Sequence, residues 1–369
     1  MTAAQVEIQL IACVVAVACA LPGCFLVLRR MAMMSDAISH SILVGIAVGF
    51  FVIRDLASPL LVVSAALTGV VTVSLVEILT RTRRVREDAA IGLVFPALFS
   101  IGVILISRYA GNVHLDVDAV LLGELAFAPF NRLLVLGYDL GPKGLYLMAG
   151  ILLLNLSFIA IFYKELKLAT FDAGLAESLG FPPAVIHYAL MTIVSVTAVG
   201  AFDAVGSVLV VALMIAPPAA AYLITDRLSF LLAISSLIGV VCAVSGYWVA
   251  HALDVSIAGS MATMTGIIFV ATFLAAPERG LAAIFLRRSR QRVEFAQTML
   301  LVHLYNHEGL PEEERENHLS HLHEHLKWAL SFSERIVAAA GRKGSLSRDG
   351  DLLFLTERGR EKARQAMVG

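Results

Sequence analysis

The sequence predicts an all-α polytopic membrane protein with eight or nine transmembrane helices, followed by a small α+β domain. Of the 369 residues, 59% are hydrophobic and 15% are charged, and the mean hydropathy is +0.83. A soluble chain of this length has no interior large enough to bury so much apolar surface. After about residue 287 the composition changes abruptly to charged and polar. We therefore expect a transmembrane domain at 1–286 and a separate C-terminal extension at 287–369.

Apolar segments long enough to cross a bilayer follow one another through the first domain. They cover approximately 7–27, 33–53, 59–79, 90–108, 144–163, 186–202, 204–224, 229–250 and 256–276. The stretch from 186 to 224 is either two spans broken near Asp203 or one bent element, which leaves eight or nine helices. All four cysteines fall within these segments without metal-ligand spacing, so we interpret them as small core residues.

Basic residues cluster in loops that would share one side of the membrane if the spans alternate. These loops carry Arg29 and Arg30, the stretch 81–86, Lys164 and Lys167, Arg227, and the stretch 287–290. An excess of lysine and arginine marks the cytoplasmic side of a membrane protein. The N-terminus is therefore expected outside the cell and the C-terminal extension in the cytoplasm.

The second apolar segment carries a carboxylate and an imidazole, Asp36 and His40, four residues apart. Residues at this spacing share one face of a helix. If Arg29 and Arg30 mark one membrane surface, a rise of about 1.5 Å per residue puts His40 about 15 Å inside, near mid-membrane. Ionisable groups at this depth should face a protein-lined or watery path, and Asp with His is a ligand pair for divalent transition metals. Alternatively, the two side chains only satisfy each other, or a neighbouring helix, inside a packed bundle.

A second row on the same segment consists of small residues at every fourth position. Such a row allows another helix to pack closely. Its members are Ala37, Ser41, Gly45 and Gly49.

Residues 29–41, Arg-Arg-Met-Ala-Met-Met-Ser-Asp-Ala-Ile-Ser-His-Ser, resemble the second-helix signature of the manganese/zinc/iron permeases of ATP-binding-cassette importers. The resemblance covers roughly residues 7–280, and two further motifs, at 164–180 and 205–223, agree in order and spacing. It implies that Asp36 and His40 bind the metal in transit. It also implies a cytoplasmic ATPase on a separate chain, an extracytoplasmic metal-binding protein, and a second permease copy or paralogue in a bacterial inner membrane.

The stretch 164–180 interrupts the membrane pattern with a short amphipathic segment, in which we expect Leu175, Ala176 and Leu179 to share one face. On its own, such a segment lies at the membrane interface. The resemblance implies instead that it docks against the nucleotide-binding subunit. The residues implied in ATPase coupling are Phe171, Asp172, Leu175, Ala176, Leu179 and Gly180.

The chain contains no G-x-x-x-x-G-K-[ST] phosphate-binding loop and no catalytic constellation. We therefore expect a transporter subunit rather than an enzyme, with no permanently bound cofactor. In the second matching motif, Pro217 and Pro218 remove backbone donors inside a span, which predicts a kink.

The stretch at 109–143 is too polar for an ordinary span, and we expect a re-entrant or interfacial piece on the outer side. Its charged residues either attract cations at an outer mouth or cap helices and lie solvated. They are His114, Asp116, Asp118 and Glu124.

In the extension we expect helices at roughly 293–305, 312–327 and 331–341, a hairpin around Asp349-Gly350, and a closing helix after Thr356. This order resembles a winged-helix domain like those of metal-dependent repressors. Acidic residues dilute the basic charge, which favours a regulatory or protein-contact module over DNA binding.

Three histidines of the extension, His318, His321 and His325, have spacings that place them on one helical face. They are a candidate regulatory metal site. The alternative is a solvated histidine-rich helix.

These observations favour the permease subunit of an ATP-driven importer of a divalent transition metal that works by alternating access. Manganese is preferred because the extension resembles iron/manganese-responsive repressors, and zinc and ferrous iron remain open because an Asp–His pair does not choose sharply among them. One alternative is a membrane-anchored metal sensor and transcription regulator acting through the extension. Another is a secondary transporter that needs no ATPase.

Overall fold

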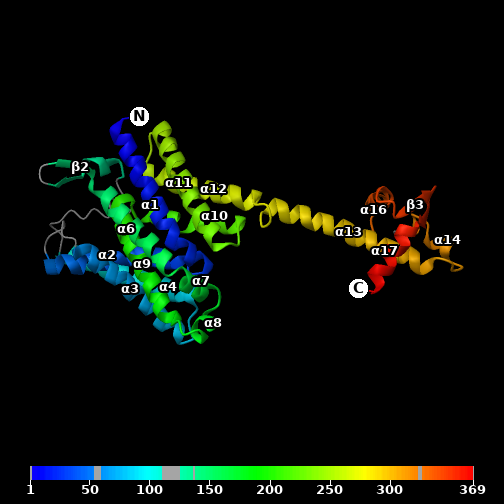
Figure 1. Cartoon of the computed structure of the whole chain (residues 1–369), viewed down its shortest axis with the longest axis horizontal. Coiled ribbons are helices and arrows are strands. Elements are labelled where there is room, and N and C mark those ends of the chain that lie inside the picture. Colours follow the sequence, from blue (N-terminus) through cyan, green and yellow to red (C-terminus); the bar gives the residue numbers. More distant parts are fainter. Residues whose placement is uncertain (1, 54–59, 110–124, 136–137, 323–325, 369) are drawn as a thin grey trace. The chain divides into compact units, whose positions relative to one another are not determined.

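The structure of the chain is a computed structural model that describes residues 2–53, 60–109, 125–135, 138–322 and 326–368 (Figure 1). The chain divides into two compact units, Met1–Gly280 and Leu281–Gly369. The first is built almost entirely of helices, and the second combines helices with a two-stranded hairpin. Each unit is described separately below.

Nine helices of the described residues are long and apolar enough to cross a membrane. They are α1 (Ala3–Leu28), α2 (Met33–Ile53), α3 (Leu60–Arg81), α4 (Glu87–Tyr109), α6 (Lys143–Ile161), α9 (Pro183–Val205), α10 (Ser207–Ile224), α11 (Leu228–Leu253) and α12 (Ile257–Ala275). The expectation of a polytopic helical protein is confirmed, with the higher of the two helix counts. The stretch 186–224 is two helices because Gly206, at φ 81°, ends α9 with a backbone that glycine adopts readily. Both Pro217 and Pro218 lie inside the continuous helix α10.

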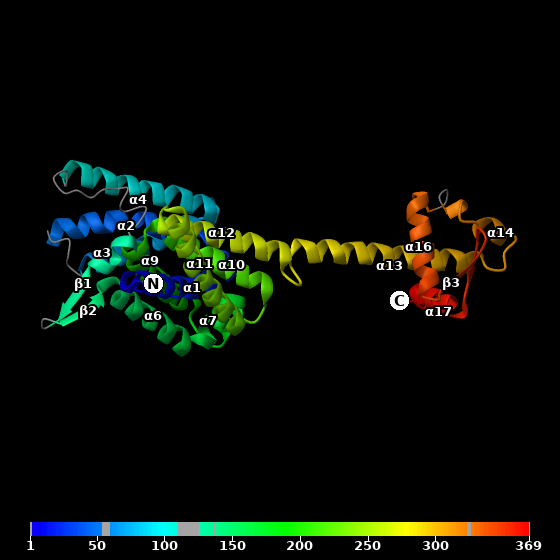
Figure 2. The same ribbon diagram turned by 90° about the horizontal axis from the view of Figure 1, so that it is seen from above.

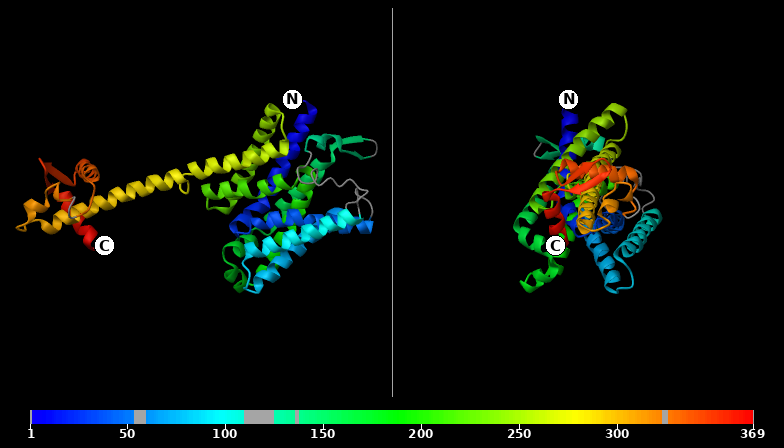
Figure 3. Two further views of the ribbon diagram at one scale, coloured as in Figure 1. Left: turned by 180° about the vertical axis from the view of Figure 1, so that it is seen from behind. Right: turned by 90° about the vertical axis from the view of Figure 1, so that its right-hand side faces the viewer.

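The described connections between these helices lie at two opposite ends of the first unit (Figure 1). At the end that holds the N-terminus are the 3₁₀ helix η1 (Leu125–Phe130) and the antiparallel strands β1 (Arg132–Val135) and β2 (Tyr138–Pro142) (Figures 1 and 3). Arg132 joins this hairpin to α1, because its guanidinium contacts Asp139 and lies 3.4 Å from the Glu7 carboxylate. Both acids raise the pKa of Arg132, Asp139 more strongly.

The short helices α7 (Tyr163–Phe171) and α8 (Ala173–Ser178) lie at the opposite end of the unit (Figure 1). The four expected outer-mouth residues lie outside the described residues. They are His114, Asp116, Asp118 and Glu124.

Helix α1 forms the centre of the first unit and packs against α6, α9, α10 and α11 (Figure 2). Because lipid is as apolar as leucine, such helices associate through close packing and interhelical hydrogen bonds rather than through the hydrophobic effect. The buried Asn155 of α6 supplies both: its Nδ2 donates to the Ala18 carbonyl of α1 (2.9 Å) and to Thr197 Oγ1 of α9 (3.0 Å). The cysteines are free thiols, three buried and one half-buried, as expected of small core residues.

Helix α2 packs closely against α3 along its row of small residues. A Cβ atom added at Gly45 would lie 2.7 Å from the Ala65 Cα, which no real side chain tolerates. Two hydrogen bonds cross the same contact: Thr72 Oγ1 donates to Ser41 Oγ (2.7 Å), and Ser64 Oγ donates to the Gly45 carbonyl (2.9 Å). The predicted packing role of the small row is confirmed.

The second unit has its own hydrophobic core, to which Leu300, Leu322, Ile336, Leu353 and Ala363 contribute. Its elements are α13 (Leu281–His307), α14 (Glu313–Glu316), α16 (Leu330–Arg342), β3 (Leu346–Asp349), β4 (Leu352–Leu355) and α17 (Glu357–Val368). Strands β3 and β4 form an antiparallel hairpin in which Asp349 pairs with Leu352. Gly350, at φ 59°, provides the left-handed turn residue, which confirms the predicted hairpin.

The expected helix over 312–327 is wrong, because α14 ends at Glu316. The next residues pair with the hairpin instead of continuing the helix. Leu319 N donates to the Asp351 carbonyl (2.9 Å), and Leu353 N donates to the Asn317 carbonyl (3.0 Å). Tertiary backbone pairing has overridden the local helical pattern.

We predict that Gly45→Leu destabilises the first unit by about 1–3 kcal/mol, because the larger side chain forces α2 away from α3. The measurement is the thermal unfolding of the detergent-purified chain, followed by loss of the monodisperse peak in size-exclusion chromatography. Gly150→Leu is the matched control, since nothing lies within 4 Å of a Cβ at Gly150 of α6. Equal unfolding temperatures for the two variants would contradict close α2–α3 packing.

Candidate metal-binding site

The carboxylate of Asp36 and the imidazole of His40 lie side by side on α2. The Asp36 Oδ1 is 3.3 Å from the His40 Nε2, and about the same fraction of each side chain, 28% and 29%, is exposed. This distance is slightly longer than an ordinary N–H···O hydrogen bond. Donor atoms at this separation are both within reach of one ion, because a tetrahedral metal with bonds of about 2.0–2.2 Å holds its ligand atoms about 3.3–3.6 Å apart.

Aromatic side chains of α4 form the wall next to His40. The centroid of the His40 ring lies 5.7 Å from that of Phe95 and 6.0 Å from that of Phe99. Gly102 allows α4 to approach closely, since a Cβ there would be 3.0 Å from Val44 N of α2. Helix α2 therefore presents two neighbouring faces, its small residues to α3 and its ionisable pair toward α4.

The pair lies nearer one end of α2 than the sequence estimate indicated. Asp36 is in the first helical turn, and His40 is about 10 Å along a helix about 31 Å long. The estimate near mid-membrane counted from Arg30, but Arg30 adopts φ 62° and α2 begins only at Met33. The chain turns after α1 before it re-enters a helix, and this shortens the path to His40.

A cavity of about 230 Å³ lies at the same end of α2. It is lined by Met31, Met34, Val73, Val76, Glu77, Thr80, Glu87 and His187. Carboxylate, imidazole and thioether groups therefore share this space, and all three are metal-ligand types. None of these residues was predicted from the sequence to bind metal. The available signal was Glu77, a carboxylate inside the apolar segment that forms α3.

Arg29 lies in the turn before α2 and links it to α7 and to α9. Its Nε donates to Thr170 Oγ1 (3.2 Å), and its Nη1 lies 3.2 Å from His187 Nδ1. A guanidinium group only donates, so this His187 nitrogen accepts and the ring proton is on Nε2. Burial lowers the pKa of Arg29, but a guanidinium remains protonated in proteins.

The residues implied in ATPase coupling lie in and around α8. Asp172 caps this helix by accepting a hydrogen bond from Leu175 N (2.9 Å), and Gly180, at φ 85°, ends the turn that follows it. Both Leu175 and Leu179 are exposed, as is Phe171, whereas Ala176 is fully buried. The expectation that Ala176 shares a face with the two leucines is wrong, because a residue one position from Leu175 is rotated about 100° around the helix axis.

The expected histidine face of the second unit is also wrong for the residues that can be assessed. His318 lies in a bridge to Leu352, outside any helix, and its Nδ1 is 3.1 Å from Ser320 Oγ. His321 instead lies beside Glu316, with 3.5 Å between Nε2 and Oε1. The third expected ligand, His325, is outside the described residues.

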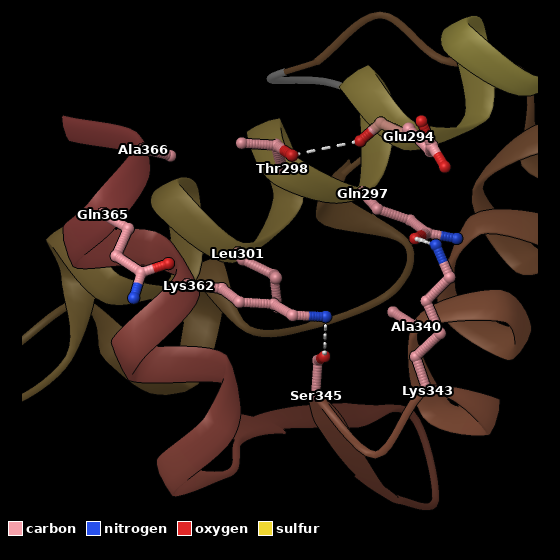
Figure 4. Close-up of a pocket in the computed structure, with 10 residues that line it drawn as sticks. All are labelled: Glu294, Gln297, Thr298, Leu301, Ala340, Lys343, Ser345, Lys362, Gln365 and Ala366. Atoms are coloured by element: carbon pink, nitrogen blue, oxygen red, sulfur yellow. Dashed lines mark hydrogen bonds between the residues drawn. The ribbon is translucent and has the colours of Figure 1, made fainter. Parts of the chain in front are cut away.

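The second unit also contains a polar cavity of about 470 Å³ between α13, α16 and α17 (Figure 4). Lys343 Nζ donates to Gln297 Oε1 (2.9 Å), and Lys362 Nζ donates to Ser345 Oγ (3.3 Å). Both ammonium groups are thus hydrogen bonded across the cavity wall.

Fold and site together define a polytopic helical membrane protein with an ionisable pair in its second helix and an exposed apolar connection between two spans. The model of the ABC 3 transport family matches residues 4–276. The chain belongs to this family.

Named relatives share different lengths of the chain. It is 48% identical over 353 residues to the zinc transport system membrane protein TroD of Treponema pallidum, covering 96% of each chain. It is 49% identical over 282 residues to the manganese transport system membrane protein MntD of Bacillus subtilis, covering 76% of this chain and 95% of that one. The similarity to TroD therefore extends through the second unit, whereas the similarity to MntD leaves about a quarter of this chain uncovered.

Among solved structures, the chain is similar to PsaBC from Streptococcus pneumoniae in complex with Fab. The TM-score is 0.64 at 27% identity, over 76% of this chain and 94% of that one.

We predict that Asp36→Asn weakens Mn²⁺ binding to the purified chain at least about tenfold, because it removes the anionic ligand while keeping the side-chain shape. Isothermal titration calorimetry in detergent measures the dissociation constant. The control Asp88→Asn makes the same chemical change on a carboxylate that is 77% exposed. If the two variants bind the metal equally well, Asp36 is not a ligand.

Proposed function

We propose that the chain is the transmembrane permease subunit of an ATP-driven importer of a divalent transition metal. Manganese is the first choice, and zinc and ferrous iron are the alternatives. The observation that carries the proposal is the Asp36–His40 pair, whose donor atoms lie 3.3 Å apart on one helix of a chain that belongs to the ABC 3 transport family.

The choice of metal rests on ligand chemistry and on the relatives. Imidazole nitrogen suits zinc and iron, carboxylate oxygen suits manganese, and affinity order by itself would favour zinc. Relatives at nearly equal identity, MntD and TroD, are named for manganese and for zinc. The geometry of the pair is compatible with either ion.

In the proposed mechanism, an extracytoplasmic metal-binding protein delivers the ion, and Asp36 and His40 hold it in transit. The Asp36 carboxylate offsets part of the ion's charge, which lowers the cost of bringing a dication between helices. A partner ATPase then drives the change from outward to inward access. The permease works beside a second copy of itself or a paralogue, in a bacterial inner membrane.

On the inner side, the cavity with Glu77 and Glu87 is the proposed exit for the ion. It lies beside Met34, two residues before Asp36, at the end of α2 that Arg29 and Arg30 precede. Basic loops at this end support a cytoplasmic assignment. Two carboxylates there would compete with the Asp36–His40 pair for the ion and draw it inward.

The exposed apolar group of Phe171, Leu175 and Leu179 is the proposed docking surface for the ATPase. It is also linked to the helix of the metal pair through Thr170 and Arg29. Thr170, next to Phe171, accepts a hydrogen bond from Arg29, and Arg29 lies four residues before the start of α2. A displacement of α7 and α8 would therefore act on the end of the helix that carries Asp36.

The second unit is, in our proposal, a cytoplasmic winged-helix-like module with a regulatory or protein-contact role rather than a DNA-binding one. The order of α16, the β3–β4 hairpin and α17 supports this assignment. Acidic side chains at Glu312, Glu313 and Glu314 oppose a nucleic-acid surface, which requires a concentrated positive charge.

The decisive experiment is radiolabelled metal uptake by cells that carry the intact transporter genes. We expect Asp36→Ala and His40→Ala each to abolish uptake of one metal at matched membrane expression, because each removes one of two ligands. That metal identifies the cargo.

Asp88→Ala provides the matched control, since its carboxylate is exposed on α4, and its uptake should equal that of the unmodified chain. Normal uptake by both site variants would refute the metal-path assignment. It would then favour the alternative of a membrane-anchored metal sensor.

We further predict that different variants will block docking of the ATPase and transmission of its movement to α2. Leu175→Glu together with Leu179→Glu should abolish co-purification of the ATPase, because charges replace the apolar contact surface. Arg29→Ala should leave co-purification intact but reduce uptake at least about tenfold, because it removes the hydrogen bond to Thr170.

Leu310→Glu is the control for the docking variant, since Leu310 is an equally exposed leucine of the second unit. Normal co-purification by the double variant would place the docking surface elsewhere. Normal uptake by Arg29→Ala would exclude this route of transmission.

A further inference from the structure

We propose that the second unit contains a metal site of its own, formed by His303 and His307 of α13 and Glu316 of α14, with His321 as the fourth ligand. The chemistry selects Zn²⁺ or a similar late transition metal. This site is separate from the Asp36–His40 pair, and the inference does not rest on the proposed transport function.

Three potential ligands converge in the second unit. The ligand atoms of His303, His307 and Glu316 all lie within 4.8 Å of one another. His321 approaches the same carboxylate from the other side, since Glu316 Oε1 is 3.5 Å from His321 Nε2 and Glu316 Oε2 is 3.5 Å from His303 Nε2. Three groups from α13 and α14 thus converge, and His321 adjoins them through the second carboxylate oxygen of Glu316.

The two distances from Glu316 to its neighbouring histidines match the spacing of ligands around one ion. An N–H···O hydrogen bond is about 2.7–3.2 Å long, so 3.5 Å is too long for a good one. Ligand atoms at about 2.0–2.2 Å from a tetrahedral zinc ion lie about 3.3–3.6 Å apart. The spacing of Glu316 to its two histidines falls within this range.

Burial and charge support the same conclusion. The side chains of Glu316, His303 and His321 are only 7%, 11% and 12% exposed. A carboxylate at this depth requires a compensating charge. The Nδ1 of His307 is buried and makes no hydrogen bond within the part of the chain that the structure describes. This nitrogen is therefore available to coordinate a dication beside the Glu316 carboxylate.

The supporting structure holds the ligands on defined elements. His303 and His307 are four residues apart on α13, so both project from one helical face, and their ring centroids lie 4.8 Å apart. Glu316 is the last residue of α14, and the hairpin fixes the chain that follows, because Leu319 N donates to the Asp351 carbonyl. An ion here would join α13 to the α14 segment and stabilise the unit.

Three imidazoles and one carboxylate select the metal. Imidazole-rich sites suit zinc, copper, nickel and iron, whereas manganese prefers oxygen ligands. We therefore expect Zn²⁺ to bind much more tightly than Mn²⁺. One carboxylate and three neutral imidazoles leave the bound site with a single positive charge.

The test uses the full-length purified chain carrying Asp36→Ala and His40→Ala, so that the pair in the first unit does not contribute. After dialysis against buffered Zn²⁺, mass spectrometry of the bound element should find one equivalent per chain. Titration with Co²⁺ should give the intense visible absorption of a tetrahedral complex. Adding His303→Gln or His307→Gln should remove the absorption and weaken Zn²⁺ binding at least about tenfold.

His318→Gln is the matched control, because His318 belongs to the same segment but lies against Ser320, and it should leave the absorption unchanged. Glu316→Gln keeps the side-chain shape and tests the carboxylate. Each variant's metal-free unfolding temperature is compared with that of its parent. The site is supported if a ligand variant unfolds at the same temperature as its parent without metal but, unlike the parent, is not stabilised by added zinc.

Three results would overturn the proposal. The parent could bind no zinc, the ligand variants could bind it as tightly as the parent, or His318→Gln could lose it equally. The same comparison in the chain with Asp36 and His40 intact should show a loss of one equivalent. This result is independent of whether the chain transports metal.

Discussion

The close approach of α2 to α3 is the contact on which the arrangement of the first unit depends. Small side chains let the two backbones meet at Gly45, and hydrogen bonds from Thr72 and Ser64 cross the contact. With that face of α2 held against α3, the neighbouring face carries Asp36 and His40 toward the aromatic wall of α4. A charge at mid-bilayer costs about 2.5–3.5 kcal/mol, and the position of the pair near the helix end reduces this cost.

In the proposed mechanism, a movement of the docking surface reaches the helix of the metal pair through Arg29. Arg29 is the one described side chain that we find hydrogen bonded both to α7 and to α9 while lying in the turn that starts α2. Its two hydrogen bonds come from different nitrogens of one rigid planar guanidinium group. The single ammonium nitrogen of lysine does not provide this geometry. The adjacent cavity with Glu77 and Glu87 lies within this junction, so the same movement would alter access to it.

Sequence patterns predicted the elements whose determinants are local. Apolar length predicted eight or nine spans, and the described residues form nine. Asp349-Gly350 predicted the hairpin turn, and a spacing of four residues predicted that Asp36 and His40 would share a face. Predictions failed where pairing with backbone distant in the sequence determined the local structure. The expected helix over 312–327 ends at Glu316 because the next residues pair with β4, and no local pattern reports that partner. The same pairing places His318 in a bridge to Leu352 rather than in a helix.

The sequence by itself determined that this is a helical membrane protein with a candidate metal pair, because hydrophobic length and helical periodicity are properties of neighbouring residues. Only the tertiary structure decided which groups from distant segments meet. His303 and Glu316 lie on different helices, Arg29 lies in the turn after α1 while Thr170 lies on α7, and each pair is brought together by packing. Such contacts depend on the summed free energy of many side chains across the fold, and a one-dimensional pattern does not contain that sum.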